Sequence, residues 1–254
     1  LALAAKRLIR NNTLIRKLPA VETLGSVTYI CTDKTGTLTK NKMYVEDVFT
    51  GNRFYSRKHL IEHLHDDHEA DLLLHAFAMN NDAVEDENNN LKGDSTETAL
   101  MEVAREHNIS PKVLPRITEI AFDSNRKLMT TFHKYNDRVI AFTKGAPDVI
   151  LERCNNIDKT EISQQINKMA ANGSRVLGFA YRYWDTVPAK PNSEEHETGL
   201  QFLGLAGIID PPREEVFEAV KQCKSAGIIP VMITGDHPLT AKTIAERIGI
   251  ISTA

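Results

Sequence analysis

The residues at positions 31–37 read CTDKTGT and directly follow an apolar run at 27–30. An aspartate placed here can act as a nucleophile that takes a phosphoryl group to give an acyl phosphate. Lys34, the neighbouring threonine hydroxyls, backbone N–H groups and a bound Mg²⁺ can offset the charge of that attack. Gly36 lets the backbone come close to a phosphate. Asp33 is therefore the first candidate nucleophile; the simpler alternative is that DKTGT is only a polar turn after a strand.

A second aspartate stands in a similar place near the end of the sequence. Thr234, Gly235 and Asp236 follow the apolar run at 228–233. In open parallel sheets, ligands bind beyond the carboxyl ends of the strands. If the two strands are neighbours, Asp33 and Asp236 face one crevice, which predicts a phosphate site built from distant segments.

Apolar strands are expected at 27–32, 203–209 and 228–233, and their β-branched runs are typical of buried strands. Proline-bearing segments at 210–212 and 237–238 begin the helices that follow the last two strands. This strand–helix order predicts a parallel sheet with right-handed crossovers. The expected fold class is α/β, a partial Rossmann-like parallel sheet with a large antiparallel α+β insert.

The insert is expected to be a mainly antiparallel α+β structure. Alternating apolar residues and turn signals predict a hairpin within residues 39–55. They also predict strands at 117–122, 128–134, 139–143 and 175–184. Apolar periodicity predicts helices at 57–65, 69–79, 146–153 and 162–171, and polar composition predicts a mobile loop at 80–90. A further helix begins at Asp94, where Glu97 suits a capping box, and its apolar stripe is Ala99, Leu100, Val103 and Ala104.

The expected parallel and antiparallel strand patterns divide the chain into two predicted regions. Residues 1–38 and 200–254 form one region, in which 1–21 is a basic, stalk-like helix, and residues 39–199 form the insert. The basic stretch is either a solvated helix face or a juxtamembrane segment.

Composition narrows the class of protein further. The formal net charge is −3, so nothing in the overall charge indicates nucleic acid. The three cysteines are far apart, which argues against a disulfide framework and fits a reducing cytosol. No apolar run approaches the roughly 18 residues that a membrane helix needs. The chain begins with Leu1 and not with Met, so we expect that either it is a piece of a longer protein or its start is missing.

Several motifs together resemble one family. GSVTYICTDKTGTLTKNKM, which contains the DKTGT motif, closely resembles the phosphorylation segment of P-type ATPases, ion pumps that form an aspartyl phosphate. LPAVETLGS, just before it, is similar to the cation-pumping branch that contains the calcium pumps. KGAPD at 144–148, DPPR at 210–213 and MITGDHPLTA at 232–241 extend the resemblance over most of the chain. The resemblance implies a haloacid-dehalogenase-like parallel sheet carrying a nucleotide-binding domain at 39–199.

The resemblance also implies roles for individual residues. Asp33 matches the phosphorylated aspartate, Lys34 lies beside it, and Thr35 matches the residue that helps hold Mg²⁺ and touches the phosphate. Thr234, Gly235 and Asp236 match a loop that contacts phosphate. The remaining matches concern the nucleotide and the hinge, and they are Thr96, Glu97, Phe122, Lys127, Lys144, Gly145, Arg175, Asp210 and Arg213.

Among these, Phe122 matches the aromatic residue that stacks on adenine, and Arg175 matches an arginine that reaches the phosphates. Structural alternatives exist for the insert residues: Thr96 and Glu97 as helix-start residues, Phe122 as core, and the lysines as solvated charges. A GxxxxGK[ST] phosphate loop is absent from the sequence, so nucleotide binding cannot use that cradle.

The sequence departs from the family pattern in two places. Ser124 stands where the family often has an arginine, and nearby Arg126 is expected to compensate. The family's Gly-Asp-Gly-x-Asn-Asp segment is expected beyond Ala254, so we expect this chain to form little phosphoenzyme by itself.

We therefore expect a fragment of a cation-transporting P-type ATPase that binds ATP or ADP with Mg²⁺. The fragment is expected to be monomeric and to lie on the cytoplasmic side of a multi-pass membrane protein. The alternatives are a soluble haloacid-dehalogenase-like phosphatase and a module that only binds nucleotide. Thr35 argues against the phosphatase, because such enzymes place a second aspartate there as general acid and base. His59 and His63, spaced like metal ligands, are interpreted as part of a charged surface helix.

Overall fold

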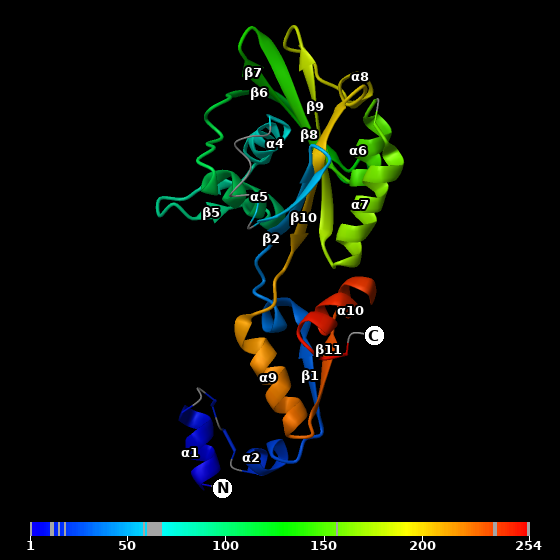
Figure 1. Cartoon of the computed structure of the whole chain (residues 1–254). Helices are drawn as coiled ribbons and strands as arrows, with labels where there is room; N and C mark the ends of the chain where they lie inside the picture. Colours follow the sequence, from blue (N-terminus) through cyan, green and yellow to red (C-terminus); the bar gives the residue numbers. More distant parts are fainter. Residues whose placement is uncertain are drawn as a thin grey trace.

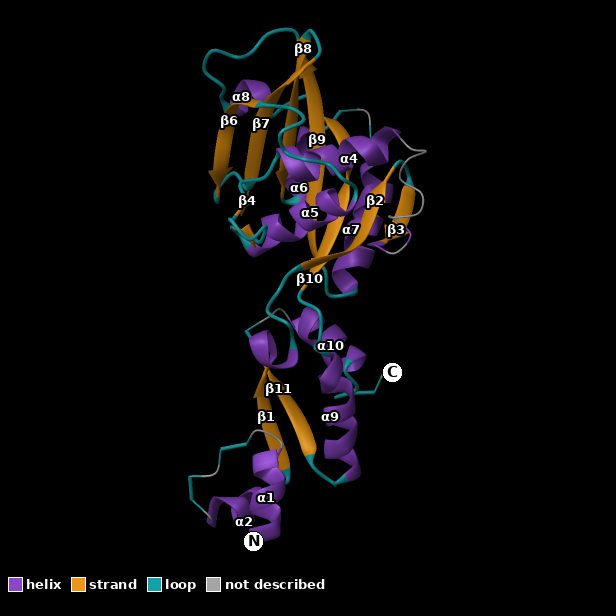
Figure 2. Cartoon of the chain, turned by 90° about the vertical axis from the view of Figure 1, so that its left-hand side faces the viewer, coloured by secondary structure: helices purple, strands orange, loops and turns teal. Residues whose placement is uncertain are grey.

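The computed structural model describes residues 2–10, 13–14, 16–17, 19–57, 59, 68–155, 157–235 and 238–252. Figures 1 and 2 show two parts, one above the other, connected by two crossings of the chain. In the described residues, the upper part is built on a seven-stranded antiparallel sheet, here called the large sheet. The lower part contains a two-stranded parallel sheet, here called the parallel sheet. The observed class is thus mixed α/β, with a large antiparallel and a small parallel sheet.

The large sheet has the strand order β3-β2-β10-β9-β8-β7-β6. Its strands are β2 (Tyr44–Thr50), β3 (Arg53–Ser56), β6 (Arg116–Asp123), β7 (Leu128–Tyr135), β8 (Arg138–Gly145), β9 (Arg175–Trp184) and β10 (Gln201–Ile209). Helices α4 (His68–Met79) and α5 (Ser95–Glu106) cover one face, and α6 (Pro147–Arg153) and α7 (Lys159–Ala171) cover the other (Figure 1). The short helix α8 (Ser193–His196) lies in the β9–β10 connection.

The main core lies between the large sheet and helices α4 and α5. Its largest fully buried side chains include Phe77 of α4, Phe142 of β8 and Phe179 of β9. The predicted apolar stripe of α5 is confirmed, because Ala99, Leu100, Val103 and Ala104 are all buried in this core. Burial of such side chains is the main favourable term in folding, so this core fixes the frame on which the insert residues lie.

Most predicted elements of the insert are confirmed with small shifts at their ends. The hairpin predicted within 39–55 is confirmed as β2 and β3, and its turn lies at Gly51 and Asn52, both with positive φ. The region predicted as a loop at 80–90 contains β4 (Val84–Glu85), which pairs with β5 (Leu91–Lys92). The helix predicted at 57–65 lies mostly outside the described residues.

The interpretation of residues 203–209 as a strand of the parallel sheet is wrong. This strand, β10, pairs antiparallel with β2 on one side and β9 on the other. Its run from Leu203 to Ile209 is buried throughout because helices cover both faces of the large sheet. A continuous apolar run therefore indicates that a strand is buried on both faces, but it does not indicate whether its neighbours are parallel or antiparallel.

In the parallel sheet, β1 (Tyr29–Asp33) pairs with β11 (Ile229–Ile233). Helices α9 (Glu214–Ser225) and α10 (Pro238–Arg247) belong to the same part, where Leu38, Val216, Val220, Ile244 and Ile248 form a small core. The prediction that the first strand is buried is wrong, because Tyr29 is 59% exposed and Ile30 is 37% exposed. Towards the N-terminus lie α1 (Ala2–Arg10) and α2 (Pro19–Leu24).

Side chains of α10 connect the lower part to the upper one. Arg247 of α10 forms an ion pair with Glu46 of β2, with nitrogen–oxygen distances of 2.8 and 3.0 Å. The hydroxyl of Thr243 donates to the carbonyl oxygen of Ala171 at 2.9 Å. Within the described residues, no helix is long and apolar enough to cross a bilayer.

Candidate phosphoryl-transfer and nucleotide site

The parallel sheet brings the two aspartate-bearing segments of the sequence together. Asp33 lies opposite Ile233 at the carboxyl ends of β1 and β11, so Thr234 and Gly235 follow beside it. Asp33 is exposed at this rim. The prediction that the two strands are neighbours in one sheet is confirmed, whereas Asp236 lies outside the described residues.

The loop after Asp33 is the tight, kinked turn η1 (Lys34–Leu38). Gly36 has φ 75° there, a left-handed conformation that favours glycine. Thr35 keeps an extended conformation, with φ −74° and ψ 122°. The kink turns the chain sharply just after the candidate nucleophile, and Lys34 is buried within it.

Asp210 and Arg213 clamp this loop from the second chain crossing. The Thr39 hydroxyl donates to Asp210 Oδ2 at 2.6 Å, and the Lys42 amide donates to Asp210 Oδ1 at 3.3 Å. The Arg213 guanidinium donates to the carbonyl oxygens of Thr39 at 3.0 Å and Gly36 at 3.1 Å. These bonds give the two residues a structural role where the chain passes between the parts.

A pocket of about 230 Å³ lies between the two parts. Lys34, Asp210 and Arg175 line it, together with residues from β10 and α10. Arg175 is exposed at the start of β9. The structure thus brings Arg175, the arginine predicted to reach the phosphates, to the same pocket as the lysine beside Asp33.

In the insert, Glu97 and Lys144 form a mostly buried ion pair with an Nζ–Oε1 distance of 2.5 Å. Lys144 Nζ also donates to the carbonyl oxygen of Asn80 at 2.6 Å. Burial lowers the pKa of Lys144, and the Glu97 carboxylate only partly opposes this effect. The capping-box interpretation of Glu97 is wrong, because its carboxylate accepts from Lys144 and from the Asp82 amide, while the Asp94 carboxylate caps α5.

Phe122 is 62% exposed, so the alternative that it belongs to the core is wrong. A bulge explains its position: Ile120 lies opposite Thr130 and Asp123 opposite Leu128, so three steps of β6 match two of β7. The bulge thereby places Phe122 on the sheet face that carries Met129 and Lys144. An exposed aromatic ring on the same sheet face as a buried lysine suits a planar base with an anionic tail.

Lys127, at the end of the turn between β6 and β7, lies beside Gly145 at the end of β8. Lys127 is exposed and has φ 57°, and its carbonyl oxygen accepts from the Ala146 amide at 3.1 Å. A Cβ at Gly145 would lie 2.1 Å from that carbonyl oxygen, so only glycine fits. Thr96 lies in the first turn of α5, where its amide donates to Asp94 at 2.8 Å.

Sequence reasoning missed several residues that support this site. The side chain of Asn80 donates to the carbonyl oxygens of Met129 and Phe142, which joins α4 to β7 and β8. Arg116 pairs with Asp82 and Glu119 at 2.7 and 2.6 Å. The expectation that Arg126 replaces the missing arginine at Ser124 is not supported, because Arg126 is paired with buried Glu197. No periodicity or motif in the sequence marked the long-range contacts among these, which join Asn80 to Met129 and Phe142, Arg116 to Asp82, and Arg126 to Glu197.

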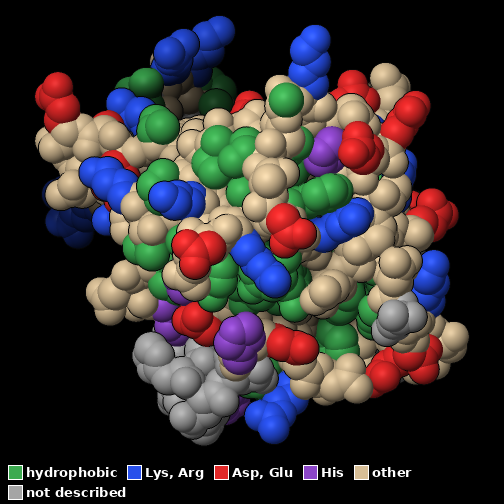
Figure 3. Space-filling view, turned by 90° about the horizontal axis from the view of Figure 1, so that it is seen from above, with side chains coloured by type: hydrophobic (Ala, Val, Ile, Leu, Met, Phe, Trp, Pro, Cys, Tyr) green, Lys and Arg blue, Asp and Glu red, His purple; other side chains and the backbone are tan. Residues whose placement is uncertain are grey.

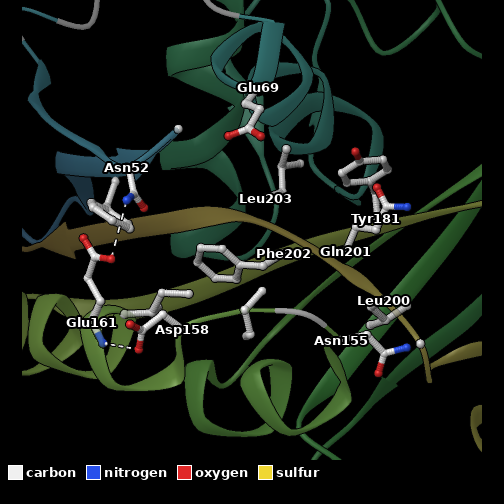
Figure 4. Close-up of a pocket in the computed structure, with 15 residues that line it drawn as sticks. Asn52, Glu69, Asn155, Asp158, Glu161, Tyr181, Leu200, Gln201, Phe202 and Leu203 are labelled. Atoms are coloured by element: carbon white, nitrogen blue, oxygen red, sulfur yellow. Dashed lines mark hydrogen bonds between the residues drawn. The ribbon is translucent and has the colours of Figure 1, made fainter.

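A different and larger pocket, of about 610 Å³, lies around the start of β10, with lining residues from the β2–β3 hairpin, α4 and α7. Figure 4 shows Phe202 and Leu203 beside it and Glu161 hydrogen-bonded to Asn52. Within the described structure, none of the predicted site residues lines this pocket. From above, acidic and basic side chains are interspersed around apolar ones at the top of the large sheet (Figure 3), in keeping with the small net charge.

The described residues contain no group of three histidine, cysteine or acidic residues placed to hold a metal. Of the paired histidines, His59 accepts or donates a bond with the Ser56 hydroxyl at 2.9 Å, and His63 lies outside the described residues. All three cysteines are free thiols, as predicted.

The sequence is similar to a known family and to several named proteins. The sequence model of the family described as P-type ATPase, cytoplasmic domain N, matches residues 69–215. The chain is 41% identical to calcium-transporting ATPase 1 of Bacillus cereus, covering 98% of this chain and 29% of the relative. It is 38% identical to the calcium-transporting ATPase of Bacillus subtilis, over 99% of this chain and 32% of the relative. Potassium-transporting ATPase alpha chain 2 of Cavia porcellus is 35% identical, with coverages of 99% and 28%. The chain thus spans less than a third of the length of these relatives.

Proposed function

The chain belongs to the P-type ATPases, and from this premise we propose that it binds ATP and supplies the phosphorylated aspartate of a cation pump. The observation that carries the proposal is the parallel pairing of β1 and β11, which sets the strand ends that lead into DKTGT and TGD side by side. The parent protein would be a membrane transporter with this segment on its cytoplasmic side. Calcium is the first candidate cation, because several relatives are named calcium-transporting ATPases.

In the proposed reaction, a carboxylate oxygen of Asp33 attacks the terminal phosphorus of ATP. The new oxygen–phosphorus bond forms as the bond to the bridging oxygen breaks, and ADP leaves with that electron pair. The Lys34 ammonium and backbone N–H groups of η1 and the following TGD segment stabilise the charge on the transferred phosphoryl group. The kink at Gly36 leaves the backbone close to the place that this group would occupy.

Mg²⁺ is the metal that the family implies. The Asp33 carboxylate and the Thr35 carbonyl are hard oxygen donors next to the same strand end, a donor set that suits Mg²⁺. When bound, the ion would neutralise phosphate charge. Thr234, Gly235 and Asp236 complete the proposed phosphate-facing rim.

On the nucleotide side, we assign adenine stacking to Phe122 and contacts near the base to Thr96 and Glu97. Lys127, Lys144 and Gly145 are assigned to the same site, and Arg175, which lines the pocket shared with Lys34, is assigned to the phosphates. Asp210 and Arg213 are assigned to the hinge that holds η1. We place the nucleotide-binding region at residues 39–209, extending the predicted 39–199, because β10 belongs to the large sheet. The remaining residues form part of a haloacid-dehalogenase-like phosphorylation region.

Nucleotide titration of this chain tests the binding half of the proposal. We expect MgATP or MgADP to bind, and Phe122→Ala to weaken binding by about tenfold because stacking on one aromatic is worth roughly 1–3 kcal/mol. Phe54→Ala is the matched control, since Phe54 is another exposed phenylalanine of the large sheet, on the distant strand β3. Equal loss in both variants, or no binding at millimolar nucleotide, would refute the assignment.

Phosphate labelling of the complete pump tests the catalytic half. With radiolabelled ATP, the parent protein should form an acid-stable, hydroxylamine-sensitive phosphoprotein, and Asp33→Asn should abolish it. Retained label in the Asn variant would place the nucleophile elsewhere. Fast hydrolysis of a generic phosphate ester by the parent would instead favour the phosphatase alternative, against which Thr35 argues.

A further inference from the structure

The turn between β6 and β7, at the β6 edge of the large sheet, carries two residues of the proposed nucleotide site. Phe122 lies in the bulge before the turn, and Lys127 closes it with φ 57°. Asp123 Oδ1 accepts from the amides of Asn125 at 3.0 Å and Arg126 at 2.9 Å, which shapes the turn locally. Because β6 is the edge strand, pairing with β7 holds it from one side only.

Arg126 connects both ends of this turn through one guanidinium group. It donates to the carbonyl oxygen of Ala121 at 2.5 Å and to that of Leu128 at 3.2 Å. Ala121 lies in the bulge directly before Phe122, where the register of the ladder shifts. The guanidinium therefore supplies a donor to the backbone at the place where the bulge disturbs the ladder.

The guanidinium is in turn held by Glu197, whose side chain is fully buried. Arg126 NH1 lies 2.9 Å from both carboxylate oxygens of Glu197. The hydroxyls of Thr130 at 2.7 Å and Ser193 at 2.6 Å donate to the same carboxylate. A buried carboxylate with this many donors has a single well-defined position, so it also defines the position of Arg126.

We propose that Glu197 is a positioning residue of the nucleotide site, which acts through Arg126 to hold the β6–β7 turn and its exposed Phe122 in the stacking position. The inference rests on the proposed function, since it takes Phe122 as the adenine-stacking residue. Without the carboxylate, the guanidinium turns to solvent, the Ala121 carbonyl loses its donor, and the edge of β6 loosens. Adenine binding then falls, although Lys34 and Arg175, the groups outside the turn that are assigned to the phosphates, are untouched.

Two variants separate positioning from general stability. Glu197→Gln removes the charge that holds Arg126. Arg126→Lys keeps a cation beside Glu197 but cannot reach both carbonyl oxygens, because only the arginine fork presents donors in several fixed directions. Thr50→Val is the matched control, since it removes another fully buried hydrogen bond, 2.8 Å from the Thr50 hydroxyl to the Leu203 carbonyl, far from the turn.

The experiment titrates the full 254-residue chain and its variants with MgATP and, separately, with inorganic tripolyphosphate, which lacks the base. Fluorescence of the single tryptophan, Trp184, reports whether the packing around α8 is intact, because its ring lies 4.8 Å from that of His196. We expect both turn variants to weaken MgATP binding by about tenfold and to leave tripolyphosphate binding and Trp184 emission nearly unchanged.

Unchanged MgATP affinity in Arg126→Lys would overturn the positioning role while leaving the proposed function intact. Equal weakening for MgATP and tripolyphosphate, or the same loss in Thr50→Val, would also overturn it, because a general loss of structure explains that pattern. If the unaltered chain binds no MgATP, the proposed nucleotide site itself fails. Should Glu197→Gln not fold, Arg126→Lys alone decides the question.

Discussion

Replacing Lys144 with methionine tests what its buried ion pair contributes to stability and to the proposed nucleotide binding. The lysine side chain is 9% exposed, and its partner Glu97 is 15% exposed. Methionine keeps most of the aliphatic stem but removes the ammonium group, so Glu97 and the Asn80 carbonyl both lose a donor. The perturbation therefore leaves an uncompensated, mostly buried carboxylate beside the first turn of α5.

The size of the effect follows from this burial. Removing one partner of a buried ion pair costs about 3–5 kcal/mol, and the partial exposure of Glu97 points to the lower end, about 3 kcal/mol. For a protein of this size, such a loss lowers the melting temperature by about 6–12 °C. Adding Glu97→Gln should restore most of the stability, because a neutral amide tolerates burial better than a lone carboxylate.

The assay measures urea and thermal unfolding by circular dichroism, and MgATP affinity by calorimetry. The double variant should regain stability without regaining affinity, which separates the structural role of the ion pair from its role toward nucleotide. Lys190→Met, at an exposed position, is the control and should change neither quantity by more than about 0.5 kcal/mol. The reasoning is refuted if Lys144→Met unfolds like the unaltered chain, or if the double variant is no more stable than the single one.

Three further outcomes follow from single buried or constrained residues. Burial lowers the pKa of His133 from 6.5 to about 4, so the unfolded chain binds a proton that the folded chain resists. Stability should therefore fall as the pH drops from 6.5 to 4, by up to about 3 kcal/mol, and less so in His133→Gln. Gly145→Ala should destabilise by about 3 kcal/mol or more and disturb the neighbouring turn, because its Cβ would lie 2.1 Å from the Lys127 carbonyl oxygen. Iodoacetamide should modify exposed Cys31 readily but not native Cys154, since burial raises the pKa of that thiol to about 12.

Each of these three predictions can be refuted by a specific result. Identical acid sensitivity of the unaltered chain and His133→Gln would show that other groups govern acid unfolding. For glycine, Gly25→Ala is the control because its added Cβ meets only ordinary contacts, so equal stability losses would remove the steric argument. Mass spectrometry of the alkylated native chain reads the cysteines directly, and early modification of Cys154 would mean that its cover opens easily.

Local sequence predicted most elements of the insert because their signals are local. Apolar periodicity marks α4 and α5, and the Gly51–Asn52 turn joins β2 to β3. The same kind of signal misplaced β10, since an apolar run shows that a strand is covered on both faces but not which neighbours it has. Exposure of β1 was missed for a related reason, because covering layers are contributed by distant residues.

The candidate site shows the same division. DKTGT and TGD were recognisable from residue types and spacing, and their shared edge was correctly expected from the rule for parallel strands. The partner of Glu97 was not predictable, because a carboxylate three residues after an N-cap suits a capping box equally well until Lys144 is placed beside it. Exposure of Phe122 depends on a bulge that no local pattern announces.

The sequence by itself determined which groups are available for chemistry: a carboxylate after a strand, which we propose as the nucleophile, a glycine that permits a sharp turn, and motifs typical of the family. Only the tertiary structure decided which groups form contacts. Examples are the hydrogen bonds of Thr39 to Asp210, of Lys144 to Glu97 and of Arg126 to Glu197. The physical reason is that motifs and periodicity are set by neighbouring residues, whereas a buried polar group must find its partner wherever the packed chain brings one within hydrogen-bonding distance.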